Sequence, residues 1–392
     1  MSGSAPRTPR LTAVLRGDEE RVMPLELFFD LVFVLAVTQC TALMARDPSW
    51  ETLAQGLLVL GVLWWAWVGY SWLTSVLDPE EGVVLVALFA AMAALVVAAL
   101  CIPTAFGHAA GLFAAAYGVV RGGQIALFIV ASRDDPDLLG AVLRFAPTAI
   151  VGASLIVAAG FFHGDERVAI WLIALAIDYV GPAIIGPGRG WHIAPEHFAE
   201  RHGLIVLIAL GESIVAIGVG AGFELVTRVI VAAALGIVVI SALWWLYFDV
   251  AAILARTRLT QASGVAQANL ARDGYSYLHL PLVAGIVLFA FGLKTTLGHV
   301  SDELATVPAV GLCGGAALYL LGHIAFLLRT TRRLWRRRTI GAVVLLALIP
   351  AAVAVPALAA LGLVAAVCSS VVAYEAIRRR EHRTQVRHPE LA

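Results

Sequence analysis

Charged residues are scarce in this chain. They make up 14% of its 392 residues, whereas a soluble globular protein carries about 25%. Hydrophobic residues reach 60% and the mean hydropathy is +0.89. Apolar runs of about 20 residues, the length of helix that crosses a bilayer, recur from end to end. The composition therefore excludes a soluble protein and predicts an all-α, polytopic transmembrane helical bundle.

Several chemical signatures are missing as well. The four cysteines lie in apolar stretches without CxxC spacing, so we expect neither disulfides nor a metal site. HExxH, GxSxG and Walker sequences are absent, which argues against an enzyme, and no cofactor is predicted. The net charge is zero and the arginines are spread over loops, so no nucleic-acid partner is expected. Residues 1–22 are polar and mixed in charge, so no cleavable signal is expected.

The apolar runs are separated by polar or turn-forming segments, among them "ARTRLTQASGVAQANLARDG". Pro350 and Pro356 interrupt the last stretch, so its division is the least defined. About twelve spans result: roughly 25–45, 53–77, 82–103, 108–132, 140–162, 168–186, 203–222, 228–252, 277–297, 306–328, 339–356 and 358–377.

The distribution of arginine predicts how the chain crosses the membrane. One side collects the arginines of the N-terminal segment, of the "RRLWRRR" loop and of the tail, against Arg46, Arg167, Arg228 and Lys294 near loops of the other side. Cytoplasmic loops carry the excess of Lys and Arg. Both termini are therefore expected in the cytoplasm, with the spans in the bacterial plasma membrane and the basic segments near anionic lipid.

The order of several motifs indicates an internal duplication. "LELFFDLVFVLAVTQ" opens the first span and "AERHGLIVLIALGES" the seventh, while "WWAWVGY" and "WWLYFDV" lie in the second and eighth. "YGVVR" and "YLLGH" keep a Tyr and a basic residue four apart. An even number of spans per copy gives two parallel repeats. We expect a cytoplasmic segment 1–22, repeats at 23–200 and 201–378, and a basic tail 379–392.

Ionisable side chains lie at membrane depth, where an isolated charge costs several kcal/mol. Three carboxylates, those of Asp30, Asp178 and Glu212, face one buried arginine, Arg121, so at least one carboxyl is expected to be protonated. Such groups either lock helices together, as a pair of Arg121 with Asp178 or Glu212 would, or form an ion or proton site. The candidates for binding a solute or ion are Glu26, Asp30, Arg121, Asp178, Glu200, Arg201, Glu212 and His323. The candidates for gating or support are Tyr117, His197, Asp249, Arg272 and His279.

The segment "WHIAPEHFAERH" contains His192, His197, Glu200 and His202, which raises the question of a metal site. Two metal ligands on one helix face must be three or four residues apart in sequence, and among these four residues only His197 and Glu200 are. Pro195 and the acids instead fit the start of a helix, so no metal is predicted. Arg201 and Glu212 share a helix face three turns apart and are expected to line something polar.

Two of these motifs resemble a known family. "LELFFDLVFVLAVTQ" and "PEHFAERHGLIVLIALGESIVAIG", with "WWLYFD" and "DYVGP", are similar to signatures of the bacterial low temperature requirement protein A (LtrA) family over residues 20–380. The resemblance implies a multi-span membrane protein but no substrate or reaction. It singles out Glu26, Phe29, Asp30, His197, Glu200, Arg201, Gly211 and Glu212. His202 departs from the family pattern, so it is assigned no role.

Three functions are compatible with these features. The first is a proton- or cation-coupled transporter with a central polar site between two six-helix halves and an unidentified small solute or ion. The second is a passive cation or proton channel, because "ELFFDLVF" faintly resembles a motif of cation channels built from two six-span repeats. The third is an intramembrane or lipid-handling enzyme using His197, Glu200 and "ARDGYSYLHL". The sequence allows a homodimer but does not require one.

Overall fold

Helices make up the fold. The computed structural model describes residues 21–80, 82–191, 193–222 and 226–378, and these ranges contain no β-strand. Eleven helices in them are long and apolar enough to cross a membrane. The predicted all-α, polytopic bundle is confirmed.

Six of the long helices form the first half of the chain. They are α1 (Pro24–Arg46), α2 (Trp50–Thr74), α3 (Gly82–Cys101), α4 (Ala110–Ala131), α5 (Pro136–Ala159) and α6 (Gly164–Ile185), with a short 3₁₀ turn, η1 (Ile102–Thr104), after α3. The next helix, α7, begins at Pro195, so the predicted division at residues 200 and 201 falls inside it. The segment before α7 separates the two halves.

The second half has five long helices and several short ones. The long helices are α7 (Pro195–Ala221), α8 (Thr227–Phe248), α11 (His279–Gly298), α13 (Gly315–Thr331) and α16 (Ala357–Arg378). The short ones are α9 (Ala251–Gln261), α10 (Gly264–Leu270), α12 (Thr306–Ala309), α14 (Arg336–Ala347) and α15 (Ile349–Ala352), with π-helical segments η2 (Ala271–Tyr277) and η3 (Val310–Gly314).

Two segments differ from the sequence prediction. The span expected at 339–356 is divided into α14 and α15, because Pro350 has no N–H and its ring clashes with the carbonyl one turn earlier. The "ARTRLTQASGVAQANLARDG" segment, expected to be a break, is almost entirely helical. Its Ala, Leu and Gln residues favour helix, and Gly264, with φ of +55°, marks the interruption between α9 and α10.

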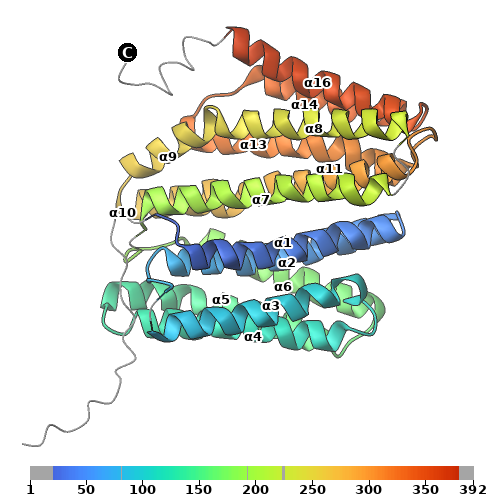
Figure 1. Ribbon diagram of the computed structural model, residues 1–392. Helices are drawn as coiled ribbons and strands as arrows, with labels where there is room; N and C mark the ends of the chain where they lie inside the picture. The colour runs from blue at the N-terminus through green and yellow to red at the C-terminus, as the bar shows by residue number, and fades with distance from the viewer. Residues whose placement is uncertain (1–20, 81, 192, 223–225, 379–392) are drawn as a thin grey trace, which may run out of the picture.

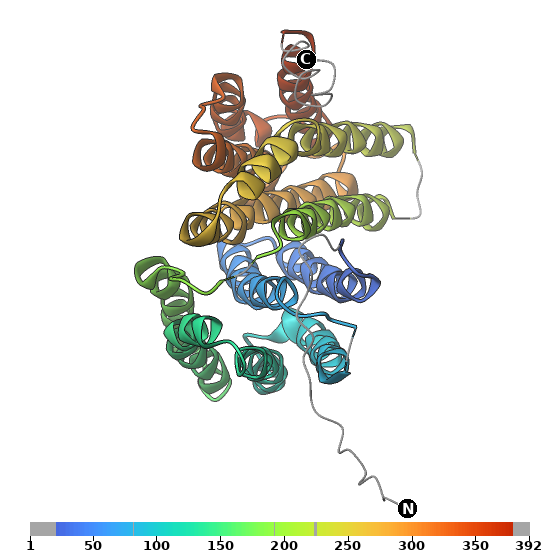
Figure 2. The same ribbon diagram turned by 90° about the vertical axis from the view of Figure 1, so that its left-hand side faces the viewer.

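The long helices run side by side, with the first half below and the second half above in Figure 1. Helices α1 and α2 of the first half meet α7 and α11 of the second. The start of α1 and the end of α16 lie at the same end of the bundle, and Figure 2, viewed from that end, shows the two halves stacked on each other. The contact between halves therefore includes α1, the helix that carries the buried acids Glu26 and Asp30.

The order of packing is the same in the two halves. In the first, α1 packs on α2 and α3, followed by α3 on α4, α4 on α5, α5 on α6 and α6 on α2. In the second, α7 packs on α8 and α11, followed by α11 on α13, α13 on α14, α14 on α16 and α16 on α8. Each half thus closes a ring through six segments.

The crossing of α11 and α13 depends on glycine. A Cβ on Gly285 would lie 2.5 Å from the backbone nitrogen of Tyr319, so the two helices approach more closely than larger residues permit. We expect Gly285→Ala to lower the stability of the purified protein by at least about 2 kcal/mol, because backbone atoms cannot yield as a side chain does. Thermal unfolding in detergent measures this. Gly298→Ala in the same helix is the control, since nothing lies within 4 Å of that position; equal stability of the two variants would contradict the prediction.

Candidate functional site

An ion-pair cluster joins the two halves of the molecule. Arg201 of α7 donates from Nη1 to Glu26 Oε1 and from Nη2 to Asp30 Oδ1, each at 3.1 Å. His197 Nε2 lies 2.9 Å from Glu26 Oε2. Each of the four side chains is at most 1% exposed. The sequence analysis counted Arg121 as the one buried arginine, because Arg201 lies at the entrance of its span. The structure shows that Arg201 is buried as well and compensates the charges of Asp30 and Glu26.

Neighbouring side chains of α1 and α2 enclose this cluster. Trp67 Nε1 donates to Asp30 Oδ1 at 2.7 Å, and Thr74 accepts a hydrogen bond from Arg201. The guanidinium carbon of Arg201 lies 5.9 Å from the ring centre of Phe29 and 5.7 Å from that of Trp67, a cation–π geometry. The cluster is sealed on these sides and holds α1, α2 and α7 together.

Glu212 lies elsewhere on the contact between halves. Its carboxyl group is hydrogen-bonded to the hydroxyl of Thr38 in α1, and its residue is 2% exposed. No ion pair to Glu212 exists within the described part of the chain. Arg201 and Glu212 share a helix face, yet each belongs to a separate cluster. Among the three acids that the sequence placed at membrane depth, Glu212 is the one without a paired cation among the described residues.

Arg121 and Asp178 meet inside the first half. Arg121 Nη2 lies 3.5 Å from Asp178 Oδ1, and its Nη1 donates to Gln124 Oε1 at 2.6 Å. Glycine makes room for the acid, because a Cβ on Gly152 of α5 would lie 2.4 Å from Asp178 Oδ1. Of the two partners that the sequence suggested for Arg121, Asp178 is therefore the one it pairs with. The other, Glu212, is hydrogen-bonded to Thr38.

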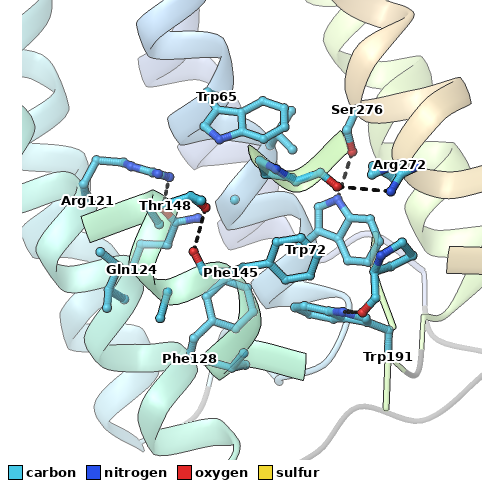
Figure 3. A pocket seen from close by; sticks show the side chains of 18 residues that line it. Trp65, Trp72, Arg121, Gln124, Phe128, Phe145, Thr148, Trp191, Arg272 and Ser276 are labelled. Atoms are coloured by element: carbon cyan, nitrogen blue, oxygen red, sulfur yellow. Dashed lines mark hydrogen bonds between the residues drawn. The ribbon is translucent and has the colours of Figure 1, made fainter. Parts of the chain in front are cut away.

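A cavity of about 130 Å³ lies beside this pair, between α2, α4, α5 and α6 of the first half and η2 of the second. Figure 3 shows Arg121 with Gln124 on one side of it and Arg272 with Ser276 on the other, with aromatic rings between them. Arg272 is bound to Asp273 at 2.7 Å and donates to the carbonyl of Pro182 at 3.2 Å. Asp30, Asp178 and Glu212 are not among its lining residues. The first half supplies most of the wall of this first-half cavity, and Arg272 and Ser276 of η2 complete the wall from the second half.

A second buried network occupies the other half. Arg338 of α14 donates to Glu375 of α16 at 2.7 and 2.9 Å, to the carbonyl of Leu246 at 3.1 Å, and to His323. Arg338, Glu375 and His323 are each at most 3% exposed as whole residues. Sequence reasoning missed Arg338 and Glu375, because Arg338 belongs to the "RRLWRRR" run and Glu375 lies close to the basic tail. The sequence did contain one indication of this network, because Glu375 is the single acid inside the last apolar span.

The other predicted residues are dispersed. Glu200 is exposed and accepts from the backbone of Val22 at 3.5 Å, so it does not face the cluster of Arg201. Asp249 caps the end of α8. His279 accepts a hydrogen bond from Tyr247 at 2.8 Å while its Nδ1 donates to Gly274. The Tyr117 hydroxyl is buried on α4, one turn before Arg121, without a hydrogen-bond partner in the described ranges.

Apart from these dispersed residues, the candidates fall into separate groups: the contact between halves, the surroundings of the first-half cavity, and the second-half network. Within the described residues no group of three or more His, Cys, Asp or Glu side chains could hold a metal ion. His192, which prompted the question of a metal, lies outside the described residues.

Comparison with known proteins gives a family. The model of a family described as bacterial low temperature requirement A protein (LtrA) matches residues 21–373. The uncharacterized protein RA0937 of Rhizobium meliloti (strain 1021) is 32% identical over 311 residues, which cover 76% of this chain and 75% of that protein. No solved structure matches the chain. With its many membrane-length helices and a family match over most of its length, the chain is a multi-pass integral membrane protein that belongs to the bacterial LtrA family.

Proposed function

We propose that the chain is a proton-coupled secondary transporter of a small solute. Arg121 is the residue on which the proposal rests, because it lines the first-half cavity and is also paired with Asp178 behind the cavity wall. A solute group that accepts hydrogen bonds from Arg121 competes with Asp178 for the same guanidinium. The solute site and a buried acid therefore share one cation.

This sharing links solute binding to protonation. If a solute draws Arg121 away, the carboxylate of Asp178 becomes an unpaired buried charge, which costs several kcal/mol. Uptake of a proton by Asp178 removes that cost. Solute and proton therefore favour each other's binding, and the coupling is reciprocal. Movement of both together is the expected result.

Glu212 is a second proton or cation site in this proposal. It is buried without a paired cation among the described residues, and it contacts Thr38 of the opposite half. A change in its charge acts directly on the contact between halves, where the Arg201 cluster also lies. Transport by rocking of one half against the other would pass through these contacts.

Two parallel six-helix repeats form the framework of the proposal. The identical packing order of the halves supports them. When "LELFFDLVFVLAVTQ" and "AERHGLIVLIALGES" are aligned, Thr38 and Glu212 are equivalent, and their side chains meet. Equivalent residues lie at the same depth in parallel repeats, so such a contact is expected. The positions of Arg121 and His323 also match, and each lies in a buried network with an acid of the last span of its half, Asp178 or Glu375.

We place the protein in the bacterial plasma membrane with both ends in the cytoplasm. The excess of arginine at one end of the bundle supports this orientation. The start of α1 and the end of α16 share one end of the bundle, as that orientation needs. Arg272 and the loop before α7 then lie on the cytoplasmic side of the cavity.

Flux into proteoliposomes tests the transport proposal. With a panel of radiolabelled organic anions, amines and sugars and an imposed proton gradient, we expect uptake of at least one class. Arg121→Ala should lower it about tenfold or more, because a charged hydrogen bond to the solute is lost. Arg228→Gln is the control, since Arg228 binds Ser301 at the surface at 2.8 Å.

Two results would contradict transport by a carrier. The first is that Arg121→Ala and Glu212→Gln leave all uptake and proton movement unchanged. The second is a discrete, non-saturating conductance in planar bilayers, which would favour a passive channel.

A further inference from the structure

We infer that the first-half cavity binds a small organic monoanion with an aromatic or other apolar body. The inference rests on the proposed function and names its class of solute. Two observations lead to it: the shape and apolar lining of the cavity, and the charge of the groups at its ends.

Most of the cavity wall is apolar. Five aromatic side chains contribute to it: Trp65, Trp72, Phe128, Phe145 and Trp191. The volume of about 130 Å³ is near the roughly 150 Å³ that accommodates one benzene molecule in a protein interior. A body of about one ring therefore fits, and flat rings pack well against such walls.

The charged groups on the wall are both cationic. Arg121 and Arg272 line the cavity, and none of its eighteen described lining residues is acidic. Tryptophan faces also attract cations, but two guanidinium groups at the same cavity oppose a cationic solute. The electrostatics of the wall therefore select for a negative charge.

Arg121 is the better placed of the two to bind the anion. A guanidinium has five N–H donors, and Arg121 makes hydrogen bonds to Gln124 at 2.6 Å and to Asp178 at a long 3.5 Å. Its Nε has no partner within the described residues, although the side chain is only 3% exposed. Arg272 already binds Asp273 and the Pro182 carbonyl. The spare donors of Arg121 favour a charged acceptor.

Equilibrium dialysis of the purified full-length protein in detergent tests the solute class. Radiolabelled benzenesulfonate is the probe, because it remains anionic at all accessible pH values. Benzenesulfonamide is its neutral analogue of similar shape and phenyltrimethylammonium its cationic counterpart. We expect benzenesulfonate to bind about tenfold more tightly than either, the effect of one charge-assisted hydrogen bond.

Two variants locate the probe in the cavity. Arg121→Gln should remove the tenfold preference for the anion while leaving the neutral analogue unaffected. Ala146→Leu fills the cavity wall and should weaken all binding about tenfold. Its control is Val151→Leu on the same helix, where the side chain is 44% exposed and faces away from the cavity lining. The comparison of the three probes uses the unaltered protein, so it tests the solute class even if Arg121→Gln does not fold.

Three results overturn the inference: no binding of benzenesulfonate, binding of a neutral or cationic analogue as tight as that of the anion, or unchanged binding in Ala146→Leu. Failure of the proposed function is distinguishable. If benzenesulfonate binds the protein but is not taken up by proteoliposomes, the inferred binding site is supported and the transport proposal is contradicted. If a neutral or cationic solute is taken up together with protons, the transport proposal is supported and the inferred anionic class of solute is contradicted.

Discussion

Arg201→Gln is expected to prevent the two halves from packing stably against each other. Removing the guanidinium leaves the carboxylates of Glu26 and Asp30 in a buried interface, where His197 and the neutral donor Trp67 are their neighbours among the described contacts. Breaking a buried ion pair by removing one partner costs about 3–5 kcal/mol, and here one cation serves two acids. Fluorescence-detected size-exclusion chromatography with thermal unfolding should show loss of the folded peak or a large fall in melting temperature.

A combined variant separates charge from packing. Glu26→Gln, Asp30→Asn and Arg201→Gln together leave no buried charge on these residues, and should regain most of the stability lost in Arg201→Gln. Arg228→Gln, at an exposed position near the other end of the bundle, should remain within about 0.5 kcal/mol of the unaltered protein. If Arg201→Gln were as stable as the unaltered protein, the cluster would not hold the halves together.

Asp178→Asn is expected to uncouple solute movement from proton movement. The amide cannot release a proton, and it leaves Arg121 without its acid whatever the pH. A proton gradient of one pH unit across the membrane stores about 1.4 kcal/mol per proton. Transport of one proton with each solute molecule can therefore sustain an inside-to-outside solute ratio of about ten. The variant should equilibrate solute across proteoliposomes without accumulating it, while exchange of labelled for unlabelled solute continues.

Asp165→Asn provides the matched control for this experiment. Asp165 lies in the first turn of the same helix, α6, and is exposed, so accumulation should be unchanged. Proton-driven accumulation that persists in Asp178→Asn would show that the proton site lies elsewhere, with Glu212 the next residue to replace. Loss of exchange together with accumulation would indicate that Asp178 positions Arg121 rather than carrying the proton.

Membrane-length runs and their order could be read from the sequence, because hydrophobic length alone decides whether a helix can cross a bilayer. Burial of Asp30, Arg121, Asp178 and Glu212 followed from the same cost of exposing charge to lipid, and the structure confirms that each is nearly inaccessible. Pro350 was visible as an interruption, and it divides the penultimate segment.

The partners of these groups could not be read in the same way. Glu26 and Arg201 are 175 residues apart, and no local pattern states which faces of α1 and α7 meet. Arg201 looked like an interfacial residue because three charged or titratable residues lie within the five positions before it and His202 follows it directly. Its burial depends on α2, which supplies Thr74 and Trp67 from a different part of the chain.

By itself, the sequence determined that the chain is a helical membrane protein, where most of its spans run and which charges must find partners, because these depend on the hydrophobicity of short segments. Only the tertiary structure decided that Arg201 serves the contact between halves, that Arg121 lines a cavity and pairs with Asp178 behind its wall, and that Glu212 meets Thr38. Those contacts join residues far apart in sequence, and they form only when helix packing fixes the rotation of each helix about its own axis.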